Sequence, residues 1–258
     1  MGKSLSDIEG LLFDLDGTVY VGDHPIEGAV ETIQYLKNKG IPLRFTTNTT
    51  TRSIKSLHDK LSGMGLPVEP DELFGVIKAA VTYLRKLDNP RCHLLLTDDP
   101  KQDFFEFPQD DENPERIIIG DVGKYWNYEL INRLFRMVMN GAEMIALQKG
   151  RYWQTENGLQ VDIGAFVAGL EYVTGKQAVV IGKPSKSFFR LALNDLGLPA
   201  ERVAMVGDDI INDVGGAQQA GMLGVLVRTG KYREEFVSQS KVSPDLVIDS
   251  VHDLISMI

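Results

Sequence analysis

The sequence is poor in cysteine and in long apolar runs. Its 258 residues include one cysteine, Cys92, so no disulfide can form within the chain. A single cysteine in a chain of this size is typical of a reducing compartment. No apolar run approaches the roughly 18 residues of a membrane span, and the first residues lack the apolar stretch of a secretory signal. We therefore expect a cytoplasmic protein.

Basic charge is also scarce. The chain has 27 Lys and Arg against 36 Asp and Glu, which gives a net charge of −9. Nucleic acids and anionic membranes are bound by clustered Lys and Arg, so we expect neither as a partner. Residues 1–6 fit the loose pattern of N-myristoylation. Because one acyl chain anchors weakly and the pattern is short, we expect a chance match, and the sequence does not decide whether it is used.

What is present is an alternation of short apolar strands and amphipathic helices. The predicted buried strands are residues 10–13, 41–46, 178–181, 203–206 and 224–227. Between several of them, apolar residues recur at helical spacing, as in Ile26, Val30, Ile33 and Leu36. This alternation predicts an α/β fold with a doubly wound parallel sheet, whose ligand site lies beyond the carboxyl ends of the strands.

The middle of the chain departs from this rhythm. Strand-like segments at 93–96 and 116–119 flank a polar stretch, and a helix is expected at about 127–140. We interpret residues 79–177 as a second α/β unit inserted into the first. Residues 1–78 and 178–258 would then form one discontinuous domain.

Charged and polar residues follow four of the predicted strands. Asp14 and Asp16 follow the first, and a lone pair of this kind is most often a turn or helix cap. Three further groups change that interpretation. Thr47 and Asn48 follow the second strand, Lys183 follows the strand at 178–181, and Asp208, Asp209 and Asp213 follow the strand at 203–206. If these strands share one sheet, all of these side chains meet at one edge.

Such a group of acids repels itself unless a cation lies among them. Oxygen ligands without His or Cys favour Mg²⁺, so the sequence predicts a magnesium site. The four histidines lie far apart and outside these groups, which argues against a zinc site. A metal ion, a lysine and hydroxyl or amide donors together suit a phosphate group.

These four groups resemble the motifs of the haloacid dehalogenase (HAD) superfamily of phosphohydrolases. The matching residues are D-L-D-G-T at 14–18, T-N at 47–48, G-K-P at 182–184 and G-D-D-I-I-N-D at 207–213. The four occur in order and span most of the chain, so the set is specific although each motif alone is weak. The insertion between the second and third motifs resembles the C2-type cap of the NagD-like subfamily IIA.

The resemblance implies a role for each motif residue. Asp14 would be the nucleophile that forms an aspartyl phosphate, and Asp16 the acid and base. Lys183 would neutralise charge in the transition state, and Thr47 and Asn48 would hold the phosphoryl oxygens. Mg²⁺ would be held by Asp14, the backbone carbonyl of Asp16, and Asp208. Asp209 and Asp213 would orient waters and Lys183.

The resemblance therefore implies a Mg²⁺-dependent phosphatase of small phosphorylated metabolites, with pyrophosphate and phosphoamides among the candidate substrates. A phosphomutase shares these motifs, and a non-catalytic phospho-ligand-binding protein is a further alternative. A dehalogenase is disfavoured, because dehalogenase members lack an acid at the position of Asp16. The resemblance also implies a specificity loop at 161–166 and a homodimer formed through the cap. The physiological substrate is left open.

Overall fold

The structure is a computed structural model that describes residues 5–155 and 158–258. It divides into two compact units. The first comprises residues 1–47, 55–75 and 183–258, and the second comprises residues 48–54 and 76–182. The sequence predicts a catalytic core of residues 1–78 and 178–258 and a cap of residues 79–177. This division stays a prediction. The myristoylation-like pattern begins in residues 1–4, which lie outside the described residues.

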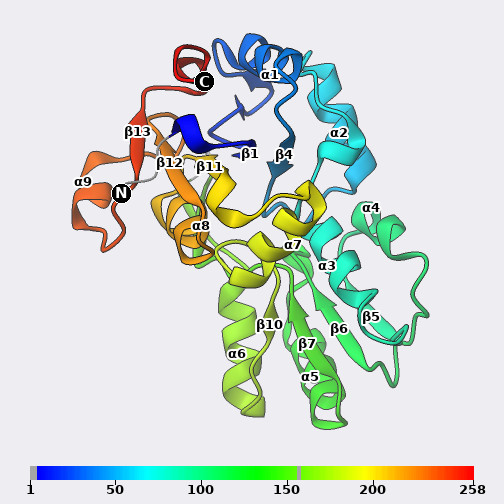
Figure 1. The fold of residues 1–258 in the computed structure, drawn as a ribbon. Coiled ribbons are helices and arrows are strands. Elements are labelled where there is room, and N and C mark those ends of the chain that lie inside the picture. Colours follow the sequence, from blue (N-terminus) through cyan, green and yellow to red (C-terminus); the bar gives the residue numbers. More distant parts are fainter. Residues whose placement is uncertain (1–4, 156–157) are drawn as a thin grey trace. The chain divides into compact units, whose positions relative to one another are not determined.

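The first unit is built on a parallel five-stranded sheet with the order β13-β12-β11-β1-β4 (Figure 1). Its strands are β1 (Gly10–Asp14), β4 (Leu43–Thr46), β11 (Val203–Gly207), β12 (Leu223–Val227) and β13 (Leu246–Ile248). Every residue of β1, β11 and β12 is buried, as expected for strands that are covered on both faces.

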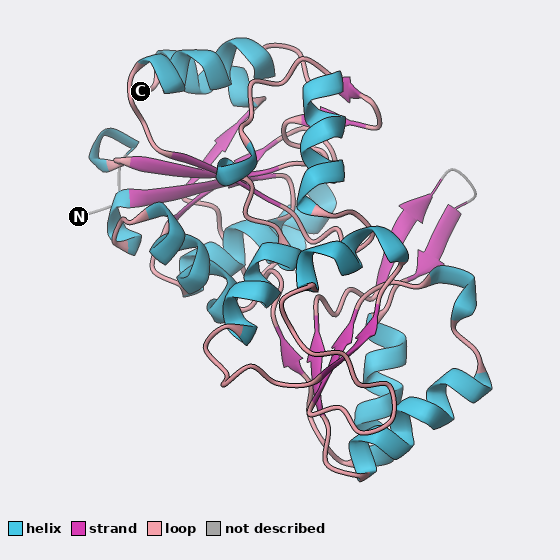
Figure 2. Cartoon of the chain, turned by 90° about the vertical axis from the view of Figure 1, so that its right-hand side faces the viewer, coloured by secondary structure: helices cyan, strands magenta, loops and turns pink. Residues whose placement is uncertain are grey.

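Helices lie on both faces of this sheet, which Figure 2 shows nearly edge-on. They are α1 (Ala29–Asn38), α2 (Ile54–Gly63), α7 (Lys186–Leu196), α8 (Gly216–Gln219) and α9 (Glu234–Gln239). Helix α1 packs against η7 (Val251–Ser256), a 3-10 helix, and α7 packs against α8. A short antiparallel pair, β2 (Tyr20–Val21) and β3 (His24–Pro25), follows β1.

The second unit has its own parallel sheet, with the order β10-β7-β6-β5. Its strands are β5 (Cys92–Leu95), β6 (Arg116–Ile119), β7 (Glu143–Ala146) and β10 (Val179–Val180). Separately, β8 (Tyr152–Thr155) pairs antiparallel with β9 (Gly158–Val161). Its helices are α3 (Val76–Leu84), α4 (Asp98–Lys101), α5 (Tyr128–Met139) and α6 (Gly164–Thr174). The predicted α/β class with a parallel core sheet and a separate α/β unit is confirmed.

Helix α5 shows how the sequence builds this unit. Asn127 caps it by accepting a hydrogen bond from the backbone N–H of Leu130 at 2.9 Å. Leu134, Met137 and Val138 lie on the face that packs into the apolar core of the unit, together with strands β6 and β7. The helix predicted at 127–140 thus agrees with the structure to within a residue at each end.

One predicted strand belongs to a different sheet from the one expected. Residues 178–181 were expected to form part of the sheet that carries Asp14, but β10 pairs with β7 in the second unit. That prediction is wrong. Both sheets are parallel and have short apolar strands, so the composition of a strand does not reveal which sheet it joins.

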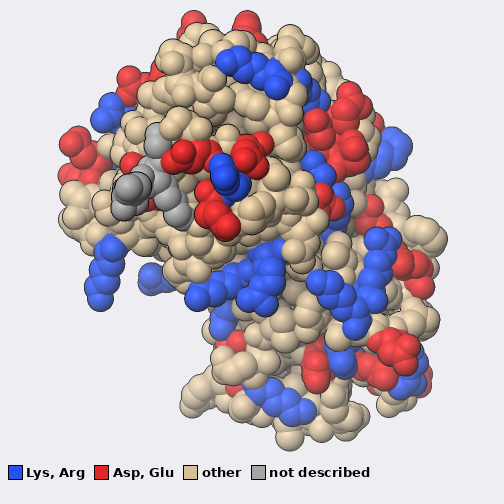
Figure 3. Space-filling model, in the orientation of Figure 1, with Lys and Arg blue, Asp and Glu red and all other residues tan. Residues whose placement is uncertain are grey.

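Surface charge of both signs is visible on the molecule. Figure 3 shows groups of acidic and basic side chains next to one another on one face. Among the residues that the structure describes, we find no helix with both the length and the hydropathy of a membrane-spanning segment.

Candidate active site

The candidate site lies at the carboxyl edge of the first unit's sheet. Strand β1 ends at Asp14, whose register partner on β4 is Thr46. Strand β11 lies on the other side of β1 and leads directly into Asp208. Because the strands are parallel, their carboxyl ends bring these residues to one edge, as the sequence predicts.

A buried lysine connects two of the predicted acids. Lys183 Nζ lies 2.5 Å from Asp14 Oδ1 and 2.7 Å from Asp213 Oδ1, and it is 3.4 Å from the hydroxyl of Thr46. The lysine is 4% exposed, Asp14 8% and Asp213 1%. Lys183 precedes α7, and Ser185 caps that helix by accepting a hydrogen bond from Phe188 N–H. Lys183 is therefore placed by the start of a helix.

Asp209 caps the segment that carries Asp213. Its Oδ1 accepts hydrogen bonds from the N–H groups of Ile211 and Asn212, at the start of the π-helical segment η6 (Ile210–Gly215). The N–H of Asp209 in turn donates to Asp213 Oδ2 at 3.1 Å. With Lys183 on Oδ1, both oxygens of Asp213 are engaged. Asp213 is thus placed to orient the lysine.

Three carboxylates form a group that fits a metal ion. Oxygens of Asp14, Asp208 and Asp213 lie within 4.8 Å of one another, and all three residues are buried. Together with Lys183 the group carries a formal charge of −2, which one divalent cation would neutralise. Asp208 Oδ1 is buried without a hydrogen-bond partner, whereas Oδ2 accepts from the N–H of Lys231 at 2.6 Å. An unpartnered buried carboxylate oxygen beside other acids fits a ligand of a hard cation such as Mg²⁺.

The electrostatics of the group show the cost of burying these charges together. Burial, followed by the charges of Asp14 and Asp213, raises the pKa of Asp208 to about 8. Burial also raises the pKa of Asp213 to about 7, although Lys183 opposes the shift. Burial disfavours the charged form of Lys183, but Asp14 and Asp213 outweigh it and raise the pKa of the lysine. The lysine therefore stays charged, and the acids need a further cation to be fully ionised.

Asp16 lies beside this group with its side chain exposed to solvent. Partial desolvation, followed by the charge of Asp14, raises its pKa, while the charges of Lys231 and Lys60 act in the opposite direction. A raised pKa increases the fraction of the carboxyl group that is protonated near neutral pH, and only the protonated form can act as an acid. This environment suits the role that the resemblance assigns to Asp16.

The remaining predicted residues are Thr47 and Asn48. Thr47 follows β4 in the first unit and is buried. Asn48 belongs to the second unit, in which its side-chain oxygen lies close to Gly182. The structure shows that Asp14, Lys183, Asp208 and Asp213 lie close together in the first unit. The chemical role of each site residue stays a prediction.

Sequence reasoning missed two contributors. Thr46 was passed over in favour of Thr47, yet its hydroxyl lies near Lys183. The segment after β12 was not among the predicted site residues, yet the N–H of its Lys231 donates to Asp208 Oδ2. The position of this segment after a predicted strand could have identified it. Because β12 pairs in parallel with β11, the residues that follow β12 lie at the same edge of the sheet as Asp208.

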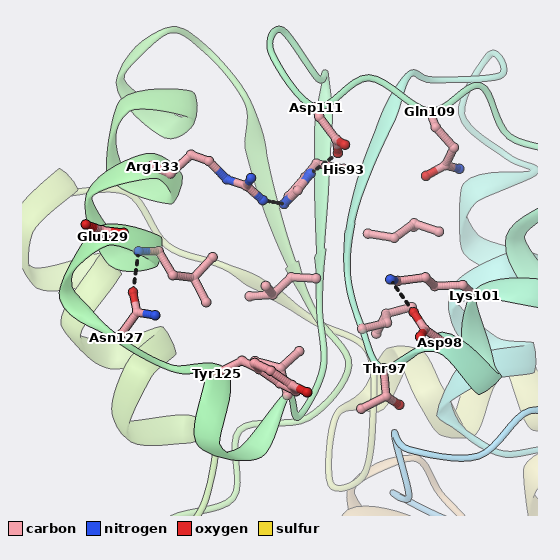
Figure 4. Close-up of a pocket in the computed structure, with 15 residues that line it drawn as sticks. His93, Thr97, Asp98, Lys101, Gln109, Asp111, Tyr125, Asn127, Glu129 and Arg133 are labelled. Atoms are coloured by element: carbon pink, nitrogen blue, oxygen red, sulfur yellow. Dashed lines mark hydrogen bonds and ion pairs between the residues drawn. The ribbon is translucent and has the colours of Figure 1, made fainter.

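The second unit has a groove of about 910 Å³ (Figure 4). Its lining residues do not include Asp14, Lys183, Asp208 or Asp213. Several of its charged and titratable side chains contact one another. His93 Nδ1 lies 2.6 Å from Asp111, its Nε2 lies 3.0 Å from an Arg133 nitrogen, and Lys101 pairs with Asp98 at 2.9 Å. The residues that line the groove include none of the predicted site residues. The groove is therefore not the candidate active site.

Comparisons with known proteins identify the family. Residues 11–107 match the family model described as haloacid dehalogenase-like hydrolase, and residues 180–254 match a second HAD hydrolase-like model. Human haloacid dehalogenase-like hydrolase domain-containing protein 2 is 38% identical over 92% of this chain and 90% of that protein. The zebrafish (Danio rerio) phospholysine phosphohistidine inorganic pyrophosphate phosphatase is 37% identical over 96% of this chain and 93% of that protein.

Solved structures agree with this result. A 4-nitrophenylphosphatase from Thermotoga maritima has a TM-score of 0.91 and 28% identity, and the match covers 98% of both chains. NagD from Escherichia coli, at 24% identity, shares the fold with a TM-score of 0.87 over 95% of this chain and 98% of that chain. The chain belongs to the haloacid dehalogenase-like hydrolase family. The predicted family and hydrolase class are confirmed.

Proposed function

We propose that this protein is a Mg²⁺-dependent phosphatase that cleaves small phosphorylated metabolites through an aspartyl-phosphate intermediate on Asp14. The observation that carries the proposal is the buried group of Asp14, Lys183, Asp208 and Asp213, with its excess negative charge and its unpartnered Asp208 oxygen. The HAD-type phosphatase class agrees with the family and with the names of the relatives.

In the first step, a carboxylate oxygen of Asp14 forms a bond to phosphorus while the bond from phosphorus to the leaving oxygen breaks. Asp16 gives its proton to that oxygen, which its raised pKa permits. Lys183, held 2.5 Å from Asp14, neutralises the charge that builds on the nucleophile and on the phosphoryl group. Asp213 keeps the ammonium group in this position.

In the second step, Asp16 accepts a proton from a water molecule that attacks phosphorus, and the bond to Asp14 breaks to release phosphate. Asp14, the backbone carbonyl of Asp16, and Asp208 would hold the ion. When bound, Mg²⁺ supplies neutralisation of the phosphoryl oxygens. Thr47 and Asn48 are assigned to those oxygens by the family resemblance alone.

The substrate class is taken from relatives whose names state an activity. One is named for phospholysine, phosphohistidine and inorganic pyrophosphate, and a structural relative for 4-nitrophenyl phosphate. We propose phosphomonoesters as the main class, with pyrophosphate and phosphoamides as further candidates. Residues 161–166 stay assigned to specificity, and they include the end of β9 and the start of α6.

We also propose a homodimer formed through the second unit. Large apolar side chains are exposed on its two long helices: Tyr128 on α5 is 82% exposed, and Tyr172 and Val173 on α6 are 89% and 52% exposed. Contact between two copies would cover them. Light scattering should give twice the monomer mass, and a monomer at micromolar concentration would remove this proposal.

The test of the function is hydrolysis of 4-nitrophenyl phosphate by the purified protein. We expect release of free phosphate that requires Mg²⁺, stops with EDTA and returns when Mg²⁺ is added. A phosphomutase would instead move the phosphoryl group between positions of a sugar phosphate without net phosphate release. A non-catalytic binding protein would bind phosphate esters without turnover, and either result would end the proposal.

A further inference from the structure

The segment Thr229–Lys231, which follows β12, makes two hydrogen bonds to the candidate active site. The hydroxyl of Thr229 donates to the backbone oxygen of Gly17 at 2.5 Å. The N–H of Lys231 donates to Asp208 Oδ2 at 2.6 Å. Gly17 directly follows Asp16, so this segment connects the loop after β1 to the acid that follows β11.

Two glycines make this close approach possible. Gly17 has φ 91° and Gly230 has φ 58°, both in the region that favours glycine. A Cβ added at Gly230 would lie 2.1 Å from Asp208 Oδ2 and 2.5 Å from Gly17 Cα, and one added at Gly17 would lie 2.0 Å from the same oxygen. The two backbones therefore close around Asp208 Oδ2 and leave no room for a side chain.

The other oxygen of Asp208 is in the opposite situation, because Oδ1 is buried and has no hydrogen-bond partner. One oxygen is thus fixed by the protein and the other is left for a ligand. Residues that hold a metal ligand by its second atom set its orientation, and substituting them commonly weakens metal affinity by roughly 10- to 100-fold.

We propose that Thr229–Lys231 is a positioning loop for the metal ligand Asp208. Its Lys231 N–H fixes Oδ2 so that Oδ1 is presented to the metal ion, and its Thr229 hydroxyl connects this arrangement to the loop after β1, which carries Asp16. This inference rests on the proposed function, because it assumes that the ion binds at Asp208. These residues orient the ligand and do not themselves contact the reacting atoms.

The test is a calorimetric titration of the substrate-free protein with Mg²⁺, which needs no turnover. Thr229→Val keeps the shape of the side chain and removes its hydroxyl, so we expect about tenfold weaker Mg²⁺ binding. Thr229→Ser keeps a hydroxyl and should bind Mg²⁺ nearly as the wild type does. The matched control is Thr32→Val in α1, which removes a similar bond from a buried hydroxyl to the backbone oxygen of Gly28 and should leave Mg²⁺ affinity unchanged.

A second variant acts on the same contact from the backbone side. Gly230→Ala places a methyl group against Asp208 Oδ2, and we expect it to weaken Mg²⁺ binding at least as much as Thr229→Val does. Its control is Gly40→Ala, because Gly40 has φ 73° and nothing within 4 Å of an added Cβ. Thermal unfolding shows whether each variant is folded, and the milder Thr229 pair keeps the test available if Gly230→Ala is not.

Kinetics provide a separate measurement. In Thr229→Val the Mg²⁺ concentration for half-maximal rate should rise about tenfold, while kcat at saturating Mg²⁺ stays near the wild-type value. A segment that is only a turn would lower stability and leave Mg²⁺ affinity unchanged, and that result in Thr229→Val would overturn the inference. If the wild type itself takes up no Mg²⁺, the metal site of the proposed function is wrong and the inference falls with it.

Discussion

The two parallel sheets of this protein are built from similar strands but treat buried charge differently. At the carboxyl edge of the first unit's sheet, three buried carboxylates lie close together and one lysine pairs with two of them, which leaves a formal charge of −2. In the second unit, buried Glu171 pairs with Lys149, and buried His93 lies between Asp111 and Arg133. A parallel sheet therefore does not by itself mark a candidate active site; the excess of buried negative charge at the edge of the first sheet does.

Replacing an acid in each unit should give the largest contrast. Asp14→Asn removes the nucleophile, so we expect turnover of 4-nitrophenyl phosphate to fall by roughly 10⁴-fold or more while the far-ultraviolet circular dichroism stays unchanged. Asp111→Asn, in the second unit, should change turnover by less than about twofold. Comparable losses in the two variants would contradict the contrast between the units.

Removing the lysine of each buried ion pair should separate catalysis from stability. Lys183→Met leaves Asp14 and Asp213 without their cation, and we expect turnover to fall by about 10²- to 10³-fold and the free energy of unfolding by about 3 kcal/mol. Lys149→Met leaves Glu171 unpaired, so it should lower stability by about 1–3 kcal/mol with turnover nearly unchanged. Denaturant unfolding and steady-state rates measure both effects; a large rate loss in Lys149→Met would show that this pair is not purely structural.

Without metal, the first unit should weaken as the pH rises. The pKa of Asp208 is about 8 in the folded protein against about 4 when unfolded. Between these values the folded state binds more protons, so the free energy of unfolding falls as pH increases from about 4 to 8. Asp208→Asn should therefore stabilise the metal-free protein at pH 8 by on the order of 1–3 kcal/mol and remove its stabilisation by Mg²⁺. Thermal unfolding in EDTA at pH 5 and pH 8 tests this; a wild type that is more stable at pH 8 would refute it.

The second unit should show a smaller effect of opposite sign. Burial lowers the pKa of His93, and the charge of Arg133 adds to this, against the hydrogen bond to Asp111. The unfolded state then binds more protons near pH 6, so stability falls as the pH drops through the usual histidine range. Hydrogen exchange around β5 should accelerate from pH 7.5 to pH 5.5, after correction for the intrinsic rate, by an amount worth less than about 1 kcal/mol. His93→Gln should abolish that acceleration, and an unchanged response would exclude His93 as its cause.

Much of the candidate site could be predicted because it depends on local order along the chain. Asp14 ends one buried strand and Asp208 directly follows another, and parallel strands bring such positions to one edge. The sequence predicts that Lys183 lies near Asp14, and the structure shows this contact, but the predicted reason for it is wrong. Its preceding strand, β10, belongs to the second unit's sheet, and the start of α7 places the lysine instead.

What could not be predicted depends on contacts between distant residues. Strand β10 belongs to the second unit's sheet because it pairs with β7. Its sequence, Val179–Val180, does not indicate this partner. Thr229 and Gly17 are 212 positions apart, so their hydrogen bond leaves no local pattern. The strand at Glu143–Ala146 is short, has one β-branched residue and does not alternate between polar and apolar residues, so tertiary pairing defines it.

The most direct test of the central claim is to locate the phosphoryl group during turnover. The protein is mixed with 4-nitrophenyl phosphate and Mg²⁺, quenched in acid within milliseconds, digested and analysed by mass spectrometry. We predict that the peptide containing Asp14 gains the mass of one phosphoryl group, and that Asp16→Asn, which slows hydrolysis of the intermediate, increases its amount. Turnover with the phosphoryl group on another residue, or with no covalent intermediate in either protein, would contradict the account.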